Sequence, residues 1–192
     1  MITIKNSFLV GKRHYLRILE YVDIGERYLS WMTDPEVTRY LAPIGQVHTL
    51  ETLQKYWRQN QKENVKFLAI IDKNNDAHIG NVRFEIYDVS AGVAELGMII
   101  GEKTYWGKSC MYDVYGMLIK YAFEELGLQK VTLGAEADHV ASIITFKKLG
   151  FQVEKWAKNA YSKNERTVEC IHFQLPLEDY LKNKTSNLLS MS

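Results

Sequence analysis

The chain has 192 residues, 46% of them hydrophobic, and its 24 basic and 23 acidic side chains leave a formal net charge of +1. A chain of this size can bury one substantial core, so we expect a single domain over residues 1–181 and a flexible polar tail over residues 182–192. The nearly balanced charge gives no general attraction to nucleic acid or to an anionic membrane, so neither is an expected partner.

The cysteines and the N-terminus indicate the compartment. Cys110 and Cys170 lie far apart without a CxxC spacing, so neither a disulfide framework nor a structural metal site is expected. Residues 1–6 lack the charged start and apolar run of a signal peptide, and no apolar run is long enough to span a bilayer. These features predict a cytoplasmic protein in a reducing environment.

Helices are expected early in the chain, after one short strand. Residues 15–18 alternate in polarity like a strand. Asp23 is suited to cap a helix that ends near Met32, and Asp34 with the proline after it is suited to begin a second helix. Residues 51–61 are rich in helix formers and predict a third.

Three strands in succession are expected next, over residues 66–71, 78–87 and 93–100. The first two are joined by a turn at residues 72–76, which makes them a hairpin. A long amphipathic helix follows the third strand at once and runs to about Leu126, where Gly127 is suited to the C′ position.

The remaining pattern is a strand at residues 130–134, a helix at residues 138–149, and strands at residues 151–156 and 168–175. The strands at 93–100 and 130–134 should be parallel, because a helix joins them in a right-handed crossover. We therefore expect an α/β (α+β) fold with a mixed, mostly antiparallel sheet of about six to seven strands and helices on both faces.

The stretch from Ala94 to Met111 says most about function. An apolar strand runs into a short turn that carries Gly107 and Lys108, and a long helix begins directly after it. Such a turn directs backbone N–H groups and the positive end of a helix dipole at one spot. That spot is suited to a phosphate or pyrophosphate group.

Short motifs along nearly the whole chain, to about Leu175, carry a family resemblance. They are Tyr15-Leu16-Arg17, Trp31-Met32-Thr33-Asp34-Pro35-Glu36-Val37, His78-Ile79-Gly80-Asn81, Glu95-Leu96-Gly97-Met98-Ile99-Ile100-Gly101, Tyr105-Trp106-Gly107-Lys108, Tyr121-Ala122-Phe123, and Ala141-Ser142 with Lys148-Leu149-Gly150-Phe151. In this order and spacing they resemble the GNAT superfamily of acetyl-CoA-dependent N-acetyltransferases. The most similar branch contains ribosomal-protein alanine, spermidine and amino-sugar acetyltransferases.

The resemblance implies a site for acetyl-CoA, between a splayed parallel pair of strands. Backbone groups at Met98, Ile99 and Ile100 would bond the pantetheine arm as a sheet edge bonds an added strand. The helix after residue 138, with His139 and Ser142 at its start, would flank the arm. The pyrophosphate would lie on the turn made by Trp106, Gly107, Lys108, Ser109, Cys110 and Met111.

Four positions depart from the family pattern. Ser109 stands where a glycine is usual, and Met111 where the family has a small residue. His139 replaces an asparagine. Phe146 occupies the place of the tyrosine that many relatives use as general acid, so it has no proton to give.

Glu95 is the first candidate for the base that removes the amine proton. It lies beside the expected thioester inside an apolar run, where partial burial would suit a general base. Alternatively, Glu95 lies on a solvated strand face or pairs with Arg83. Glu85 could serve instead or hold the substrate amine, although a surface pair with Arg83 explains it as well.

Side chains near the cofactor also have structural readings. Ser142 could hydrogen-bond the CoA arm or donate a proton to the leaving sulfur, or it could be a small residue that permits close packing. His139 is suited to a helix cap. Lys108 could contact a phosphate or simply face solvent. Cys110 is expected to pack beneath its helix and not to act as a nucleophile.

The first helices form the acceptor wall in the family, and here they carry Trp31 and Tyr40, which would bind the substrate unless they only pack against the sheet. The resemblance implies direct transfer of acetyl from acetyl-CoA to a primary amine in a ternary complex. The acceptor would be a small molecule such as an amino sugar, or a protein N-terminus. The alternative is a catalytically degenerate domain that binds CoA or a protein partner. Many relatives dimerise, so a homodimer is also implied.

Overall fold

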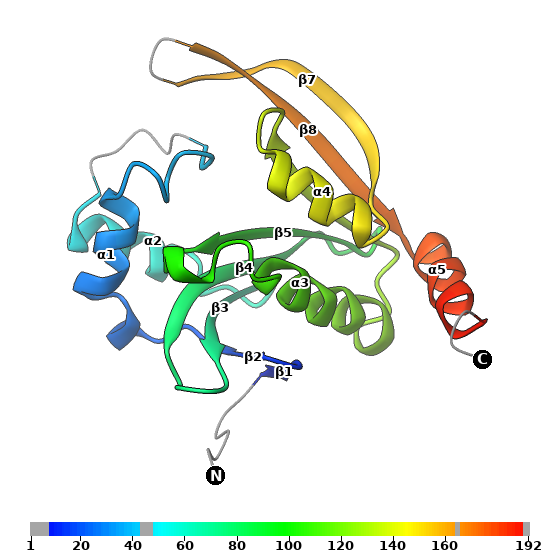
Figure 1. Ribbon diagram of the computed structural model, residues 1–192, viewed down its shortest axis with the longest axis horizontal. Helices are drawn as coiled ribbons and strands as arrows, with labels where there is room; N and C mark the ends of the chain where they lie inside the picture. The colour runs from blue at the N-terminus through cyan, green and yellow to red at the C-terminus, as the bar shows by residue number, and fades with distance from the viewer. Residues whose placement is uncertain (1–7, 43–47, 164–165, 190–192) are drawn as a thin grey trace. The chain divides into compact units, whose positions relative to one another are not determined.

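The computed structural model describes residues 8–42, 48–163 and 166–189 (Figure 1). Its strands are β1 (Leu9–Val10), β2 (His14–Ile18), β3 (Val65–Asp72), β4 (His78–Asp88), β5 (Val93–Ile100), β6 (Lys130–Glu136), β7 (Gln152–Lys163) and β8 (Arg166–Pro176). Its helices are α1 (Glu26–Thr33), α2 (Leu50–Gln59), α3 (Cys110–Lys120), α4 (Val140–Lys148) and α5 (Leu177–Leu189). Shorter helical turns are η1 (Tyr21–Asp23), η2 (Lys103–Tyr105) and η3 (Tyr121–Glu125).

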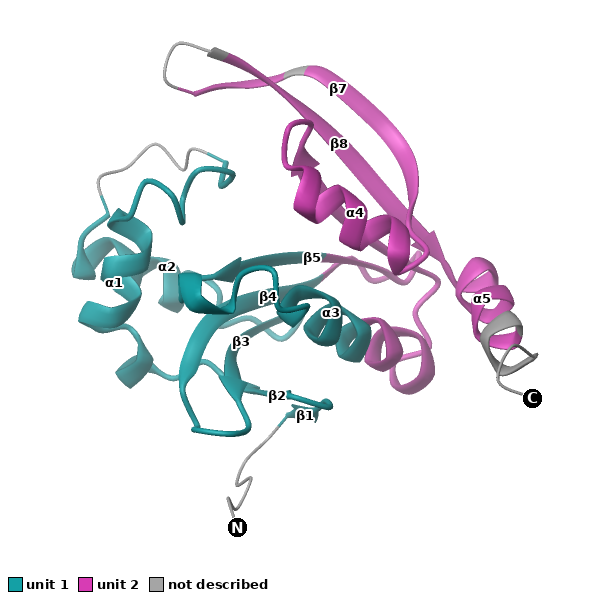
Figure 2. Cartoon of the chain, viewed as in Figure 1, with its two compact units in different colours: residues 1–85, 96–118 teal, residues 86–95, 119–192 magenta. Residues whose placement is uncertain are grey.

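The chain divides into two compact units, coloured separately in Figure 2. Unit 1 comprises residues 1–85 and 96–118, and unit 2 comprises residues 86–95 and 119–192. Strands β4 and β5 and helix α3 each contribute residues to both units.

In unit 1 the strand order is β1-β2-β3-β4-β5. Strands β1 to β4 pair in antiparallel fashion, with Leu16 opposite Ile70 and Ala69 opposite Asn81. Alternate residues of β3 point to the same side and form a core with α1 and α2, because side chains on a strand alternate between its faces. The core residues are Tyr15, Leu19, Ile24, Tyr28, Trp31, Met32, Leu53, Phe67, Ala69 and Ile71. Each large apolar side chain buried in this way contributes about 1.5–3 kcal/mol.

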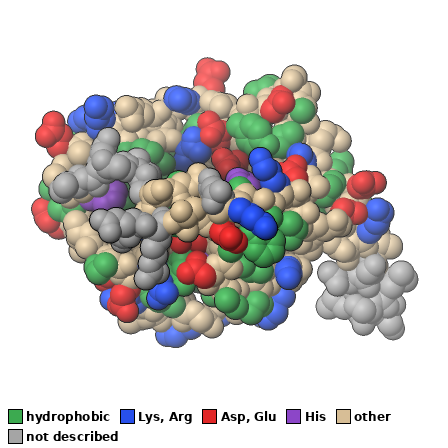
Figure 3. Space-filling model, turned by 90° about the horizontal axis from the view of Figure 1, so that it is seen from above, with side chains coloured by type: hydrophobic (Ala, Val, Ile, Leu, Met, Phe, Trp, Pro, Cys, Tyr) green, Lys and Arg blue, Asp and Glu red, His purple; other side chains and the backbone are tan. Residues whose placement is uncertain are grey.

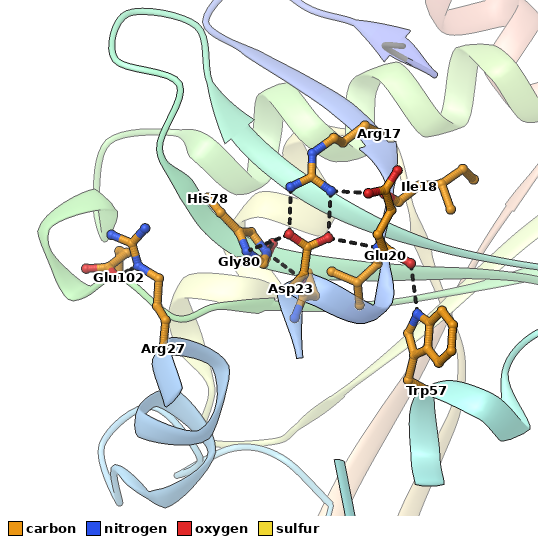
Figure 4. A network of polar contacts seen from close by, with 11 residues as sticks. Arg17, Ile18, Glu20, Asp23, Arg27, Trp57, His78, Gly80 and Glu102 are labelled. Carbon is orange, nitrogen blue, oxygen red and sulfur yellow. Dashed lines mark hydrogen bonds and ion pairs between the residues drawn. The ribbon is translucent and has the colours of Figure 1, made fainter. Parts of the chain in front are cut away.

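A polar network holds the segment that leads into α1 against strands β2 and β4 (Figure 4). Arg17 on β2 donates two hydrogen bonds to the Asp23 carboxylate, at 2.6 and 2.7 Å, and the Glu20 backbone N–H donates a third at 2.8 Å. Burial raises the pKa of Asp23, but these donors outweigh it and the pKa is lowered. His78 on β4 lies 3.9 Å from Asp23 and 2.8 Å from the Asn81 side-chain oxygen.

Asp23 therefore has a different role from the predicted helix cap. It ends η1, and α1 begins three residues later with Gly25 at the N-cap. The predicted helix at Asp34 was also wrong. Residues 35–40 form successive turns, with the Thr38 N–H bonded to the Asp34 carbonyl, and no helix follows before residue 42.

In unit 2 the strand order is β5-β6-β8-β7. Strand β6 lies beside the start of β5, where the Thr132 hydroxyl donates to the Ala94 carbonyl at 3.2 Å. Strand β8 pairs antiparallel with both β6 and β7. Phe146 of α4 packs against Phe151 and Phe173, with ring centroids 6.2 and 5.4 Å apart. This aromatic cluster is the core that holds α4 on β8.

The predicted mixed, mostly antiparallel sheet with a parallel pair is confirmed, and the pair is β5 and β6. The described residues form eight strands, because β1 was not predicted, and β7 and β8 are both longer than the predicted strands at 151–156 and 168–175. The helix after β5 begins at Cys110 and widens into the π-type turn η3 after Lys120. Gly127 adopts the expected left-handed conformation at φ 64°.

Helix α5 was not predicted. It includes residues 182–189 of the segment that was expected to be a flexible tail. Residues 190–192 of that tail, and residues 1–6 at the N-terminus, lie outside the described residues. Tyr180 of α5 stacks on Phe123 at 4.8 Å and donates a 2.6 Å hydrogen bond to Glu124. Lys184 pairs with the same carboxylate, and these contacts hold the helix on η3.

The surface shown in Figure 3 mixes Lys and Arg side chains with Asp and Glu side chains, and no large area of one sign is visible on this face. Within the described ranges, no helix is both long and apolar enough to cross a membrane. In the same ranges, no group of three or more His, Cys, Asp or Glu side chains is arranged to hold a metal ion.

Gly80→Ala should lower the free energy of unfolding by about 2 kcal/mol or more, because the added Cβ would stand 2.2 Å from the Ile99 carbonyl oxygen and force β4 and β5 apart. The matched control is Gly116→Ala in α3, where a Cβ meets nothing within 4 Å. That change should raise the free energy of unfolding by about 0.5–1 kcal/mol. Urea unfolding measures both, and equal effects would contradict the close approach of β4 and β5.

Candidate functional site

The end of β5 is held in unit 1 by a close contact with α1. A Cβ on Gly101 would stand 2.0 Å from the Trp31 ring, so only glycine lets the indole lie against the backbone there. The Trp31 indole N–H donates to Glu102 at 3.2 Å, and Arg27 donates to the same carboxylate oxygen at 3.0 Å. These contacts fix the direction in which the chain leaves β5.

The next residues are tied to the β3–β4 hairpin. The Tyr105 hydroxyl donates a 2.7 Å hydrogen bond to Asp72, which is 8% exposed. The Trp106 indole N–H donates to the Ile100 carbonyl at 2.9 Å. It therefore uses one lone pair of a carbonyl that was expected to bond the pantetheine arm, and leaves the second lone pair.

The turn before α3 has the backbone of an anion-binding loop. Gly107 and Ser109 both have positive φ, 72° and 59°, and α3 begins at the next residue. Alternating conformations of this kind form a concave nest of N–H groups, and the first turn of a helix adds N–H groups that have no intrahelical acceptor. Ser109 is therefore in the left-handed region that favours glycine, and Lys108 beside it is exposed.

The first turn of α3 is anchored by Asp113. Its carboxylate accepts hydrogen bonds from the Arg13 and His14 backbone N–H groups at 3.2 Å and lies 2.8 Å from the His14 ring. Burial raises the pKa of Asp113, but these contacts outweigh it and the pKa is lowered. Cys110 is buried as expected, and burial raises the pKa of its thiol to about 12. Met111 is half-buried.

Unit 2 contains a cavity of about 220 Å³ that includes Glu95. Its lining comprises Tyr87, Glu95, Thr132, Leu133, Glu154 and His172. Glu95 is exposed on β5, so the expected partial burial is not found. Nor does it pair with Arg83, which instead donates to Glu85 at 2.5 Å and to Asn60 at 2.7 Å.

Two features of the strands bring the polar side chains to this cavity. Phe173 faces α4, so the neighbouring His172 points to the opposite face of β8. The pairing of β7 with β8 shifts between Val153 and Lys155, which places a bulge at Glu154. A bulge interrupts the alternation of a strand and redirects a side chain.

The start of α4 carries the two predicted residues His139 and Ser142. His139 is the N-cap residue, and its ring nitrogen Nδ1 lies 2.9 Å from the hydroxyl oxygen of Ser142. Ser142 is 3% exposed. The serine hydroxyl is therefore engaged inside unit 2, and Phe146 one turn later is core.

The three predicted acceptor residues belong to unit 1. Trp31 is 4% exposed and packs on Gly101 and on the His78 ring at 5.0 Å, which favours the packing interpretation. Glu85 pairs with Arg83. Tyr40 is half-buried, with the Arg39 guanidinium 5.1 Å from its ring centre.

Sequence reasoning missed Glu154, His172 and Tyr87. The strands that carry Glu154 and His172 were expected, but their pairing register was not. The bulge at Glu154 has no signal in the local sequence, so the meeting of these side chains with Glu95 could not be read from it.

Comparison with known proteins gives a consistent result. Residues 13–152 match the family model of the acetyltransferase (GNAT) domain. The chain is 28% identical over 175 residues to the "Uncharacterized N-acetyltransferase p20" of Bacillus licheniformis, which covers 90% of this chain and 97% of that protein.

Solved structures share the fold. An acetyltransferase of the GNAT family from Bacillus anthracis has a TM-score of 0.77 at 19% identity, covering 88% of this chain and 98% of that one. A spermidine N-acetyltransferase from Vibrio cholerae, in complex with CoA and spermine, has a TM-score of 0.77 at 18% identity, with the same coverage.

Ser109→Gly should raise the free energy of unfolding by about 0.5–1 kcal/mol. A left-handed conformation costs an L-residue about 1–2 kcal/mol, and glycine removes that strain from the folded state. The greater flexibility of glycine in the unfolded chain offsets part of this gain. The adjacent control is Lys108→Gly, whose φ is not positive and whose substitution should lower stability. Urea unfolding checks the opposite signs, and a loss of stability in Ser109→Gly would contradict the strain.

The Asp113 contacts predict an acid-dependent loss of stability. The folded-state pKa of Asp113 is lower than its unfolded value, so its stabilisation is complete above about pH 4 and is lost as the pH falls through the folded pKa. Asp113→Asn should therefore reduce the loss of stability between about pH 6 and about pH 3. Thermal melts of both proteins across this range test it, and parallel pH curves would refute it.

Proposed function

The chain belongs to the family of GNAT acetyltransferases, and we propose that it transfers acetyl from acetyl-CoA to a primary amine by direct attack in a ternary complex. One observation supports this most directly. Glu95 lies on β5, and its side chain lines a polar cavity. The same strand leads into the turn before α3, where Gly107 and Ser109 have left-handed conformations. One strand thus carries both a carboxylate for the amine and the approach to an anion-binding loop.

We assign the acetyl-CoA pyrophosphate to the turn from Trp106 to Met111. The positive φ angles of Gly107 and Ser109 fit a phosphate group, because they turn successive N–H groups to one side. Met98, Ile99 and Ile100 of unit 1 are proposed to offer strand backbone to the pantetheine arm, and His139 and Ser142 of unit 2 stay the residues that the resemblance implies for the CoA arm. A solved neighbour of the same fold binds CoA.

The chemistry requires a neutral amine aimed at the thioester carbonyl. Glu95 is the carboxylate placed at the amine: it pairs with the ammonium form, and it or a group beside it takes the proton. The thiolate is a fair leaving group because a thiol titrates at about 8.5, so positioning supplies much of the catalysis. Phe146 has no proton to donate, and Ser142 is the proposed hydrogen-bond donor near the sulfur.

The acceptor is proposed to be a small molecule that presents a primary ammonium group. A cavity of about 220 Å³ has room for the amine-bearing end of a molecule and offers two carboxylates to it. An amino sugar fits this description, and a protein N-terminus is the alternative. The neighbour from Vibrio cholerae binds spermine, a polyamine.

A catalytically degenerate domain that only binds CoA or a protein is the second candidate. The observation in its favour is Phe146, which is buried at 2% exposure and fills the place of the usual acid. Tight binding of acetyl-CoA without thiol release from any amine would support this candidate. A cytoplasmic location and a homodimer stay predictions.

Thiol release from acetyl-CoA should depend on an added amine, and a panel of amino sugars, polyamines and peptide N-termini tests it. Glu95→Gln should lower kcat/KM by about 10-fold or more, because a hydrogen bond to a charged group contributes about 1.5–3 kcal/mol. The control is Glu125→Gln, an exposed carboxylate of η3 outside the cavity, which should keep wild-type activity. Unchanged kcat/KM in Glu95→Gln would refute the role of Glu95.

A further inference from the structure

We propose that His172 is the proton acceptor for the amine, while Glu95 and Glu154 bind the ammonium form of the acceptor. This inference rests on the proposed function and divides its two tasks between different side chains of one cavity. All three residues line the cavity of unit 2.

The imidazole of His172 has space beside it. Gly134 of β6 is the residue directly opposite His172 in the pairing of β6 with β8. A Cβ on Gly134 would stand 4.0 Å from the His172 Nδ1 and 3.8 Å from the Ile171 carbonyl oxygen, which is ordinary contact. The missing side chain leaves a gap on the exposed face of the sheet, where an acceptor atom can reach the ring.

The cavity also holds side chains without competing partners. Within the described part of the chain, neither Glu95 nor His172 makes a hydrogen bond or an ion pair through its side chain. Glu154, at the bulge of β7, lines the cavity and pairs with Lys130 at 3.0 Å. Glu95 is therefore the carboxylate most available to an ammonium group, and Glu154 is a partly compensated second one.

Ionisable side chains from four neighbouring strands surround His172. Glu95 comes from β5, Tyr87 from β4, and Glu154 with its partner Lys130 from β7 and β6. Lys155 of β7 is the register partner of His172. The nearby charges are thus of both signs.

Imidazole is the better chemical match for the proton. An ordinary imidazole holds a proton about 100-fold more tightly than an ordinary carboxylate, so it takes a proton from an ammonium group with a smaller penalty. An exposed carboxylate remains charged and suits the binding of a cation. The two residue types therefore fit the two tasks.

The step balances without a further reactant. His172 takes one proton from the ammonium group and leaves a neutral amine, whose lone pair forms the C–N bond at the thioester carbonyl. When the tetrahedral intermediate collapses, the C–S bond breaks and the thiolate receives the second nitrogen proton. The products are the acetamide and free CoA thiol, and His172 returns its proton to water.

Steady-state kinetics with the best amine of the panel separates the tasks. His172→Gln should lower kcat by about 100-fold or more with little change in the acceptor KM, and should remove the fall of kcat at acidic pH. Glu95→Gln should mainly raise the acceptor KM. Acetyl-CoA binding by calorimetry and the melting temperature should stay at wild-type values in both, since both side chains are exposed.

Chemical rescue and a steric variant complete the test. Added imidazole should restore turnover to His172→Gly, an outcome that a purely structural role would not produce. Gly134→Val should raise the acceptor KM without unfolding the protein, because it fills the gap beside the ring. An active wild type with unchanged kcat and pH profile in His172→Gln overturns the inference, whereas a wild type that releases no thiol with any amine overturns the proposed function itself.

Discussion

The contact between Gly101 and the Trp31 indole constrains how α1, the end of β5 and the turn before α3 fit together in unit 1. The ring occupies the place of a Cβ, so α1 can lie directly on the end of β5. The indole N–H then reaches Glu102, and the chain leaves the strand in one direction. Before the turn that leads into α3, Tyr105 donates a hydrogen bond to Asp72. After it, Asp113 accepts a hydrogen bond from the start of β2, so this turn is held at both ends. Preorganised N–H groups of this kind bind an anion without first having to be ordered.

In unit 2 a bulge in strand β7 helps to position the polar side chains of the cavity. Because side chains alternate along β8, Phe173 packs in the core and His172 lies on the open face. The bulge in β7 interrupts the alternation of that strand and places Glu154 on the same face. Binding and proton transfer place opposite demands on a side chain, since one favours a lasting charge and the other a changing one. The cavity provides both residue types, which a single carboxylate would have to combine.

Much of the fold follows from local sequence. The alternation of β2, the apolar runs of β3 to β5 and the glycine at position 127 are local signals. Together with the crossover rule for β6 they predicted the mixed sheet and its parallel pair. The errors lie where tertiary contacts override local preference. Asp23 has the residue type of a helix cap, but the Arg17 guanidinium on the neighbouring strand binds its carboxylate. For the site, the residues near Gly107 were predicted from their own segment, while His172 and Glu154 depend on the register of three strands.

The burial of Cys110 has a consequence for a protein that handles thioesters. A thiolate exchanges acyl groups with any thioester it meets, and the N-terminus of a helix ordinarily favours the thiolate. Cys110 occupies the first position of α3, yet burial keeps its thiol protonated. A buried, protonated thiol is a weak nucleophile, so Cys110 is poorly suited to take an acyl group from a thioester. The same buried, protonated sulfur should resist alkylation and oxidation, which gives the start of α3 chemical durability.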